Sequence, residues 1–505
     1  MIHHLKRLKY LGLAAISALA GALHAKQPNM LIVLVDDHAF ETISVYDSYL
    51  KDYAQTPHID RIAHEGMRFD NMTTATSICS PSRASILTGQ YGHINGVRTN
   101  SHGIHDHAPH YPEELRKAGY QTWLVGKWHI ESEPKGYEKF LIVNGQGKYT
   151  NPSFKGVDGD QVYEKYTHQL PGYSTDVYTD VALNWLDKRD KDRPFLLSLQ
   201  FKAPHFPYES ADRYKHLFKD EDIPEPPSLY EDIAASGSVL KQTMIKTDRH
   251  LSLGDGETYY DKAKKGKGGP KLNPHDPDDQ KDRHRVSYQH LAKKYLRCIR
   301  GNDDNIRRLF EYLEKENLLD DTVIVYMSDQ GYWLGQHGFF DKRLILESSM
   351  RTPFLIRYPE LIKPGSINTD LCELVDIAPT LLDLAGAPIP EAMQGRSMVP
   401  VLKGETPDDW RDAQWYAYWS GPSHHGIRTE RYTYFHVPNH SPELYDRQTD
   451  PEQLRNLANN PEYKTIIAQL EGKLKQTQQK VLMEDSGLPG NGKIKGGKKK
   501  KKKSH

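Results

Sequence analysis

The chain has 505 residues, with 67 basic side chains, 67 acidic side chains and three cysteines. That length supports a large buried core, and three cysteines cannot form a disulfide framework, so a small cross-linked scaffold is excluded. Three basic residues lie in residues 1–25 and eight in residues 491–505, which leaves 56 basic against 67 acidic residues in between, a net charge of −11. A body of that sign repels phosphate and excludes nucleic acid as a partner.

Residues 1–25 have the order of a secretory signal. Lys6, Arg7 and Lys9 precede the apolar run LGLAAISALAGAL, and the small residue Ala25 follows it. The run is too short to span a bilayer, and no later segment is apolar enough to do so. We expect a mature protein that starts near Lys26 and is exported to the periplasm or secreted; a buried first helix is the alternative.

Four apolar runs typical of buried strands end in charged or imidazole residues. The run at 30–35 ends in Asp36 and Asp37, and the runs at 122–125, 195–199 and 322–328 lead into the segments 126–129, 202–205 and 329–330. Continuous apolar runs indicate strands that are covered on both faces. Ligands of open α/β sheets bind at the carboxyl ends of the strands, so these four ends predict one active site.

Amphipathic segments at 58–66, 113–118, 178–188 and about 288–317 predict helices between the strands. The alternation predicts an α/β sandwich with a mixed or largely parallel sheet. We place this domain at 26–390, with an insertion at about 235–285 that is either solvated near the site or a disordered loop. After a helix-like segment at 375–385, aromatic strands at 415–419 and 432–435 and a helix at about 462–482 predict a smaller α+β subdomain at 391–485 with an antiparallel sheet. Residues 486–505 read as a basic disordered tail.

The strongest motif is Cys79-Ser-Pro-Ser-Arg83 followed by Ala-Ser-Ile-Leu-Thr-Gly89. It resembles the signature of type I sulfatases, in which a maturation enzyme oxidises the cysteine to formylglycine, and the similarity extends over most of the chain. The resemblance implies an alkaline-phosphatase-like α/β fold and a hydrated aldehyde, of which one hydroxyl takes the sulfuryl group and the other expels sulfate. The alternative for Cys79 is a buried small hydrophobe.

The resemblance also implies a divalent metal at the strand ends. Asp36, Asp37 and Asp329 match the family's metal-binding carboxylates, with Gln330 and the modified Cys79 as further ligands. An all-oxygen set suits a hard cation, and Ca²⁺ is favoured over Mg²⁺ because it accepts less regular coordination. The family often has Asn at the position of Gln330. Because the Gln side chain is longer, Gln330 is the least secure of the expected ligands.

The other family positions supply cations and proton carriers. Lys127 and Lys342 match the lysines that hold sulfate oxygens, and Arg83 would orient the formylglycine oxygens. His129 would take a proton from the second hydroxyl, and His205 would protonate the leaving alcohol. Two residues apart on an extended segment, Lys127 and His129 should point to the same side.

The segments 141–153 and 331–342 resemble sulfatases of the N-acetylglucosamine-6-sulfatase type and relatives that act on marine polysaccharides. The resemblance implies a sulfated oligo- or polysaccharide substrate, such as a glycosaminoglycan, mucin or algal polysaccharide. The candidate sugar contacts, each of which could equally be packing or surface, are His102, His105, His107, Trp333 and His337. The competing functions are a phosphatase or phosphodiesterase of the same superfamily and a non-catalytic glycan-binding relative.

Overall fold

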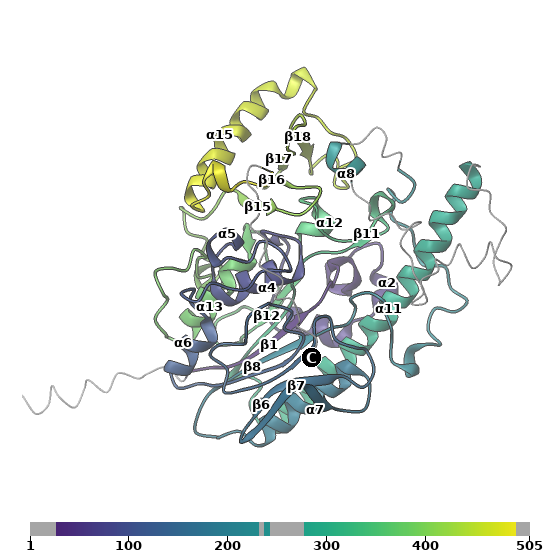
Figure 1. Ribbon diagram of the computed structural model, residues 1–505. Helices are drawn as coiled ribbons and strands as arrows, with labels where there is room; N and C mark the ends of the chain where they lie inside the picture. The colour runs from purple at the N-terminus through teal and green to yellow at the C-terminus, as the bar shows by residue number, and fades with distance from the viewer. Residues whose placement is uncertain (1–26, 232–236, 243–276, 491–505) are drawn as a thin grey trace, which may run out of the picture.

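The computed structural model describes residues 27–231, 237–242 and 277–490, and its largest element is a ten-stranded mixed sheet (Figure 1). Strands β9, β1, β8, β4 and β5 lie side by side and parallel at its centre. Antiparallel pairings add β12 and β2 on one side, where β13 then pairs parallel to β2, and β6 and β7 on the other. The strands are β1 (Asn29–Val35), β2 (Met67–Phe69), β4 (Gln121–Gly126), β5 (Lys139–Val143), β6 (Ser153–Asp158), β7 (Gln161–Gln169), β8 (Phe195–Phe201), β9 (Thr322–Ser328), β12 (Phe354–Arg357) and β13 (Ser366–Asn368).

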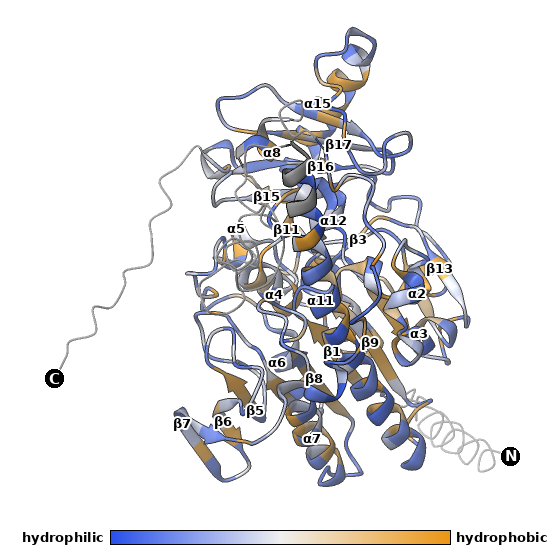
Figure 2. Cartoon of the chain, turned by 90° about the vertical axis from the view of Figure 1, so that its right-hand side faces the viewer, coloured by the Kyte–Doolittle hydropathy of each residue, from blue (hydrophilic) through white to orange (hydrophobic). Residues whose placement is uncertain are grey.

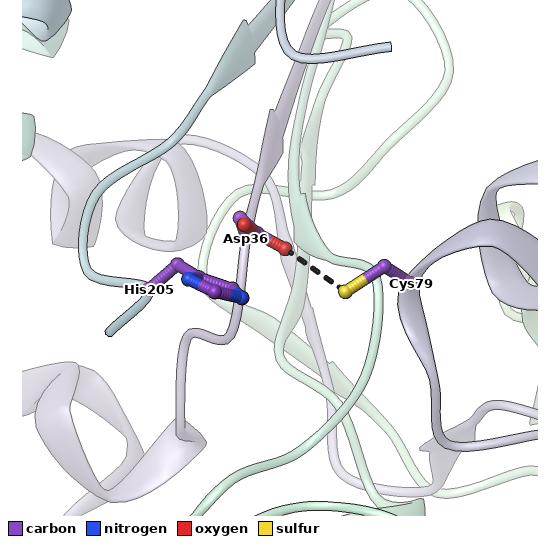
Figure 3. Close-up of side chains that lie close together, drawn as sticks. All are labelled: Asp36, Cys79 and His205. Carbon is purple, nitrogen blue, oxygen red and sulfur yellow. Dashed lines mark hydrogen bonds between the residues drawn. The ribbon is translucent and has the colours of Figure 1, made fainter. Parts of the chain in front are cut away.

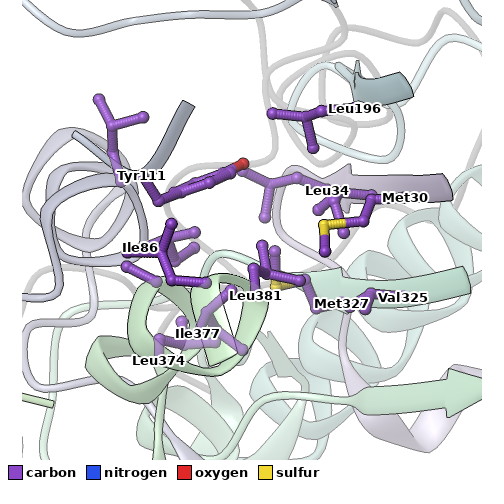
Figure 4. Packing of buried hydrophobic residues seen from close by; sticks show 14 of the residues in the cluster. Met30, Leu34, Ile86, Tyr111, Leu196, Val325, Met327, Leu374, Ile377 and Leu381 are labelled. Atoms are coloured by element: carbon purple, nitrogen blue, oxygen red, sulfur yellow. The ribbon is translucent and has the colours of Figure 1, made fainter. Parts of the chain in front are cut away.

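Helices cover both faces of this sheet, as the alternation in the sequence predicted. One face packs against α3 (Pro57–His64), α7 (Ser174–Asp187) and α11 (Pro277–Lys315), and the other against α4 (Cys79–Thr88), α6 (Tyr111–Lys117) and α13 (Ile377–Leu384). Side chains of β1 alternate between the two cores: Met30 and Leu34 pack with Ile86 and Leu381, as Figure 4 shows, and Leu31 packs on the opposite face. Figure 2 shows this pattern: the central strands β1, β8 and β9 are hydrophobic, and the helices that cover them have hydrophilic outer faces.

A second, smaller sheet forms the C-terminal part of the molecule. It is antiparallel and consists of β15 (Gln414–Tyr418), β16 (His424–Arg428), β17 (Tyr432–His436) and β18 (Glu443–Asp446), with α15 (Lys464–Lys480) packed against it. The sequence predicted β15, β17 and α15. Met398, Val401 and Leu402 belong to the large core, so the separate unit begins later than the predicted boundary at 390. Leu488 is buried in the small core, beyond the predicted start of the tail at 486.

The described ends of the predicted insertion are folded. Val239 and Leu240 of α8 (Ser238–Gln242) are fully buried against the C-terminal sheet, and α11 begins at Pro277 rather than at about 288. Most of the predicted insertion at 235–285 lies outside the described residues, and of its described parts α8 carries apolar packing. The predicted signal at 1–25 and the tail at 491–505 lie outside the described residues. Within the described chain, no helix combines the length and hydropathy that crossing a bilayer requires.

Gly126 ends β4 at a backbone φ of +116°, where a Cβ would lie 2.0 Å from the Gln200 carbonyl oxygen. Gly119 has a φ of +97°, but a Cβ there would meet nothing within 4 Å. We expect Gly119→Ala to cost about 1 kcal/mol of unfolding free energy from backbone strain alone. Gly126→Ala should cost more than about 3 kcal/mol, because strands β4 and β8 must separate. Urea unfolding of both variants measures this, and equal losses would contradict the close packing of β4 on β8.

Candidate active site

The carboxyl ends of four neighbouring parallel strands meet at one edge of the large sheet. Val35 of β1 is in register with Phe201 of β8 and Ser328 of β9, and Gly126 of β4 is in register with Gln200. The next residues along these strands are Asp36, Lys127, Lys202 and Asp329, and all four are buried. The predicted gathering of charged residues at this edge is confirmed.

Cys79 is the first residue of α4 and faces these strand ends. Its Sγ lies 3.5 Å from Asp36 Oδ1 and 3.6 Å from Lys127 Nζ, and Figure 3 shows the sulfur and His205 approaching Asp36 from different sides. Burial raises the pKa of the Cys79 thiol to about 12, although Lys127 opposes the shift. The unmodified thiol therefore stays protonated at neutral pH and is a weak nucleophile.

Arg83 lies one turn after Cys79 and is fixed by three hydrogen bonds. Its Nε donates to Asp329 Oδ2 at 2.9 Å, and its Nη1 donates to the Lys127 carbonyl at 2.7 Å and to Gln200 Oε1 at 2.9 Å. Its Nη2 lies 3.5 Å from Asp36 Oδ1 and makes no hydrogen bond with the described residues. The guanidinium is thus held rigidly with one donor group to spare for an oxygen beside Cys79.

The residues at the strand ends fit a hard cation. Carboxylate oxygens of Asp36, Asp37 and Asp329 lie within 4.8 Å of one another, and all three side chains are buried. Gln330 donates its Nε2 to Asp37 Oδ1 at 2.5 Å, while its buried Oε1 has no hydrogen-bond partner among the described residues. Three carboxylates and an amide oxygen without a donor form the type of oxygen set that Ca²⁺ and Mg²⁺ bind.

Lysines neutralise these carboxylates. Lys127 pairs with Asp36, and Lys342 Nζ lies 2.7 and 2.6 Å from the two oxygens of Asp37. Burial alone would raise the pKa of Asp36, but Lys127 and its neighbours hold that pKa well below its usual value. Burial raises the pKa of Asp37 to about 6 and that of Asp329 to about 7, so a bound cation would favour the ionised form of both.

His205 has one ring nitrogen fixed by the backbone. Its Nδ1 lies 2.7 Å from the Phe206 carbonyl oxygen, which can only accept, so Nδ1 carries a proton. Its Nε2 lies 3.6 Å from Asp37 Oδ2. Burial lowers the pKa of His205 well below its usual value, while Asp36 opposes the shift. Since Nδ1 is already protonated, Nε2 can donate a proton only from the imidazolium form.

His129 contacts Gln146, a residue whose role the sequence did not predict. Its Nε2 lies 3.2 Å from Gln146 Nε2, and its Nδ1 and Gln146 Oε1 are both buried without hydrogen-bond partners in the described chain. Burial, together with the positive charge of Lys127, lowers the pKa of His129 to about 3. His129 has a φ of +55°, so the segment from Lys127 is not extended as predicted. Gln146 is placed to select which nitrogen of His129 accepts a proton.

A pocket of about 350 Å³ opens beside Cys79 and reaches His205 and Lys342. The lining residues that had no assigned role in the sequence include Asn100, Gln146, Tyr332 and Arg343. Of these, Gln146 and Tyr332 lie in the two segments whose resemblance to carbohydrate sulfatases was noted. None of the five predicted sugar contacts lines this pocket. Trp333 and His337 are buried, His337 against Glu231, and the other three histidines lie elsewhere, so all five are wrong for this pocket.

Comparison with known proteins connects this geometry to a family. The "Sulfatase" family model matches residues 28–387, and a C-terminal model described as "N-sulphoglucosamine sulphohydrolase, C-terminal" matches residues 335–480. An N-acetylglucosamine-6-O-sulfatase of Bacteroides thetaiotaomicron is 37% identical, over 91% of this chain and 88% of its own length. An ulvan-active sulfatase of Formosa agariphila is 26% identical, over 89% of this chain and 80% of its own length. A solved structure, in complex with its substrate D-glucosamine-2-N,6-O-disulfate, has a TM-score of 0.81 and 35% identity, covering 91% and 99% of the two chains.

Metal binding can be tested at Gln330, whose Oε1 has no hydrogen-bond partner among the described residues. Gln330→Ala should weaken Ca²⁺ binding by about tenfold because it removes one oxygen ligand, whereas Gln330→Asn, which keeps an amide oxygen, should bind more tightly than the Ala variant. Isothermal titration of chelator-stripped protein with Ca²⁺, Mg²⁺ and Zn²⁺ measures both effects. Equal Ca²⁺ affinity in the Ala variant and the unmutated protein would remove Gln330 from the ligand set.

Proposed function

The chain belongs to the sulfatase family and is a sulfuric ester hydrolase, and from that premise we propose that it removes the 6-O-sulfate of a glucosamine or N-acetylglucosamine unit in a carbohydrate. The observation that carries the proposal is the similarity, at 37% and 35% identity over about nine-tenths of this chain, to an N-acetylglucosamine-6-O-sulfatase and to a structure bound to a 6-O-sulfated glucosamine. The pocket beside Cys79 supports it, because Asn100, Gln146 and Arg343 offer hydrogen bonds to sugar hydroxyls.

The cofactors of the proposed reaction are a formylglycine at Cys79 and a Ca²⁺ ion. A maturation enzyme would convert Cys79, whose hydrated aldehyde supplies a pair of hydroxyls where the buried thiol is inert. Asp36, Asp37, Asp329 and Gln330, with the modified residue 79, would hold the cation, which supplies fixed positive charge beside the sulfate. Four buried bases, Arg83, Lys127, Lys202 and Lys342, face the three buried acids, and a divalent ion would add further positive charge for an anionic ester.

The chain's own residues then bind and orient the ester. With the cation beside the carboxylates, Lys127 and Lys342 are free to hold sulfate oxygens, and Arg83 directs its spare N–H groups at residue 79. His129, oriented by Gln146, accepts a proton from residue 79 when sulfate is expelled. His205 donates a proton from Nε2 to the leaving sugar oxygen, and the negative charge of the bound ester favours the imidazolium that this step requires.

Export completes the proposal. The basic, apolar and small-residue order of residues 1–25 supports transport to the periplasm or the outside, where sulfated polysaccharides are found. The phosphatase alternative gains no support from the site. Among the described residues, only the cluster of Asp36, Asp37 and Asp329 consists of carboxylates, and the other, Asp36, Cys79 and His205, contains the residues proposed as nucleophile and general acid.

A desulfation screen tests the substrate. Mature enzyme is incubated with glucosamine sulfated at N2, O3 or O6, with N-acetylglucosamine sulfated at O3 or O6, with galactose 6-sulfate and with an aryl sulfate, and released sulfate is measured by ion chromatography. We expect the 6-sulfated glucosamines to turn over at least about 100-fold faster than the 3-sulfated isomers, because the pocket must position one ester against residue 79. Preference for another position, or turnover of the aryl sulfate alone, would overturn the 6-O assignment.

His205 supplies a separate test of the mechanism. His205→Ala should lower kcat on a sugar sulfate by about 100-fold or more, since the sugar alkoxide is a poor leaving group that needs protonation. The loss on an activated aryl sulfate should be less than about tenfold, because a nitrophenolate leaves without a proton. His216→Ala, at an exposed histidine after the same strand, is the matched control. Equal losses on both substrates would remove His205 from the role of general acid.

A further inference from the structure

A second pocket lies between the catalytic core and the C-terminal part of the chain, and it shares no lining residue with the pocket beside Cys79. Its volume is about 460 Å³. Trp333 lines it, while the preceding residue, Tyr332, lines the catalytic pocket, so the segment that leads into β10 (Trp333–Leu334) contributes to both. Nothing in the reaction described above uses this second pocket.

Five side chains that line the second pocket carry buried polar atoms without a hydrogen bond to any described residue. The atoms are Glu41 Oε2, Trp333 Nε1, Arg351 Nε, Arg447 Nε and Gln453 Nε2. Glu41, Trp333 and Gln453 are at most 5% exposed. Arg447 Nε lies 3.4 Å from Glu347 Oε1, yet outside hydrogen-bond geometry. Buried polar groups are nearly always paired, so five such atoms around one pocket require an explanation.

The catalytic site also contains buried polar atoms without hydrogen bonds, and there the proposed metal ion and substrate account for them. Arg83 Nη2, His129 Nδ1, Gln146 Oε1, Gln330 Oε1 and Arg343 Nε are buried without hydrogen bonds in the described chain. These atoms surround the positions that metal and substrate would occupy. By the same reasoning, the second cluster marks a place where a polar ligand belongs.

The charges of the second pocket favour an uncharged ligand. Arg351, Arg428 and Arg447 line it together with four acids, Glu41, Asp70, Glu347 and Glu452, and the charges balance when the Glu41 carboxyl is protonated. Arg428 Nε pairs with Glu347 Oε1, and Arg351 Nη2 lies 3.8 Å from Asp70 Oδ1. A free sulfate would need an excess of cations, and a metal ion would be repelled by the arginines. Burial raises the pKa of Glu41 to about 8, which leaves that carboxyl neutral at pH 7 and able to donate.

The unpaired groups are four N–H donors and one carboxyl, and the aromatic rings of Phe40 and Tyr49 line the same pocket. Planar guanidinium, amide and carboxyl groups beside aromatic rings suit a ligand rich in hydroxyl and ring oxygens. We propose that this pocket binds an uncharged saccharide unit, so that the protein holds glycan at a second site apart from the one that loses sulfate. The choice of a saccharide rests on the proposed carbohydrate function, and the location of the site rests on the structure.

Ser348 lines the pocket and offers a way to fill it. Ser348→Tyr adds a ring that occupies the space, and Ser348→Ala is the matched control that leaves it open. Both are made in a Cys79→Ala background and examined by saturation-transfer NMR with two uncharged disaccharides, N,N′-diacetylchitobiose and lactose. Excess glucosamine 6-sulfate saturates the catalytic pocket throughout.

We expect saturation transfer to at least one disaccharide in the Ala variant and its loss in the Tyr variant. No transfer to either disaccharide in the Ala variant, or equal transfer in both variants, would overturn the proposal. A crystal of the Ala variant soaked with the bound disaccharide, or with N,N′-diacetylchitobiose if neither binds, provides a measurement that does not depend on folding of the Tyr variant. Sugar hydrogen-bonded to Trp333 or Gln453 supports the site, and an empty pocket at saturating sugar contradicts it.

The two proposals fail separately. Sulfate release from glucosamine 6-sulfate by mature enzyme with Cys79 intact tests only the catalytic assignment, and Ser348→Tyr in that enzyme should leave this rate unchanged. Loss of disaccharide binding with intact monosaccharide desulfation therefore supports a separate second site. Loss of both in a Tyr variant that melts at the unmutated temperature would mean that the two pockets are not independent, and would overturn the proposal of a second site.

Discussion

Mutual neutralisation of buried charges is the constraint on which the active site and its scaffold depend. Seven charged side chains are buried together at one sheet edge, namely Asp36, Asp37, Asp329, Arg83, Lys127, Lys202 and Lys342. Burying an unpaired ion costs several kcal/mol of folding free energy. Removing any one of these side chains would therefore leave its partner as an unpaired buried charge. The acids thus offset most of the charge of the bases, and a bound divalent cation would add the positive charge that an anionic ester requires.

The fold supplies this cluster from rigid elements instead of loops. Parallel strands fix Asp36, Lys127 and Asp329 in register, and α4, buried along its whole length, presents Cys79 at its first position. Second contacts lock the backbone around them, as where Ser82 Oγ donates to the Asp329 carbonyl and the Tyr295 hydroxyl donates to that of Asp37. Fixed donors and charges of this kind need no rearrangement when charge moves onto the leaving oxygen, which is how preorganisation lowers a barrier.

The sequence predicts the elements that have a simple apolar periodicity. It does not predict which way individual side chains point or which loops they contact. Apolar runs identify β1, β4, β8 and β9, and the residues that follow them assemble as expected. Helix α11 begins earlier than predicted because its first turns are too polar to show an apolar stripe. Gln146 contacts His129 from a loop that no periodicity marks. Trp333 lines the second pocket while its neighbour Tyr332 lines the catalytic pocket, and composition does not record which way each side chain points.

The central claim is that residue 79 acts as a formylglycine and not as a cysteine. The most direct measurement is the mass of the tryptic peptide that contains residue 79, from protein produced together with a formylglycine-generating enzyme and assayed for sulfate release in the same preparation. The account predicts a peptide about 18 Da lighter than the cysteine form, in a fraction that rises in proportion to specific activity. Full activity in a preparation whose Cys79 peptide is entirely unmodified would contradict it.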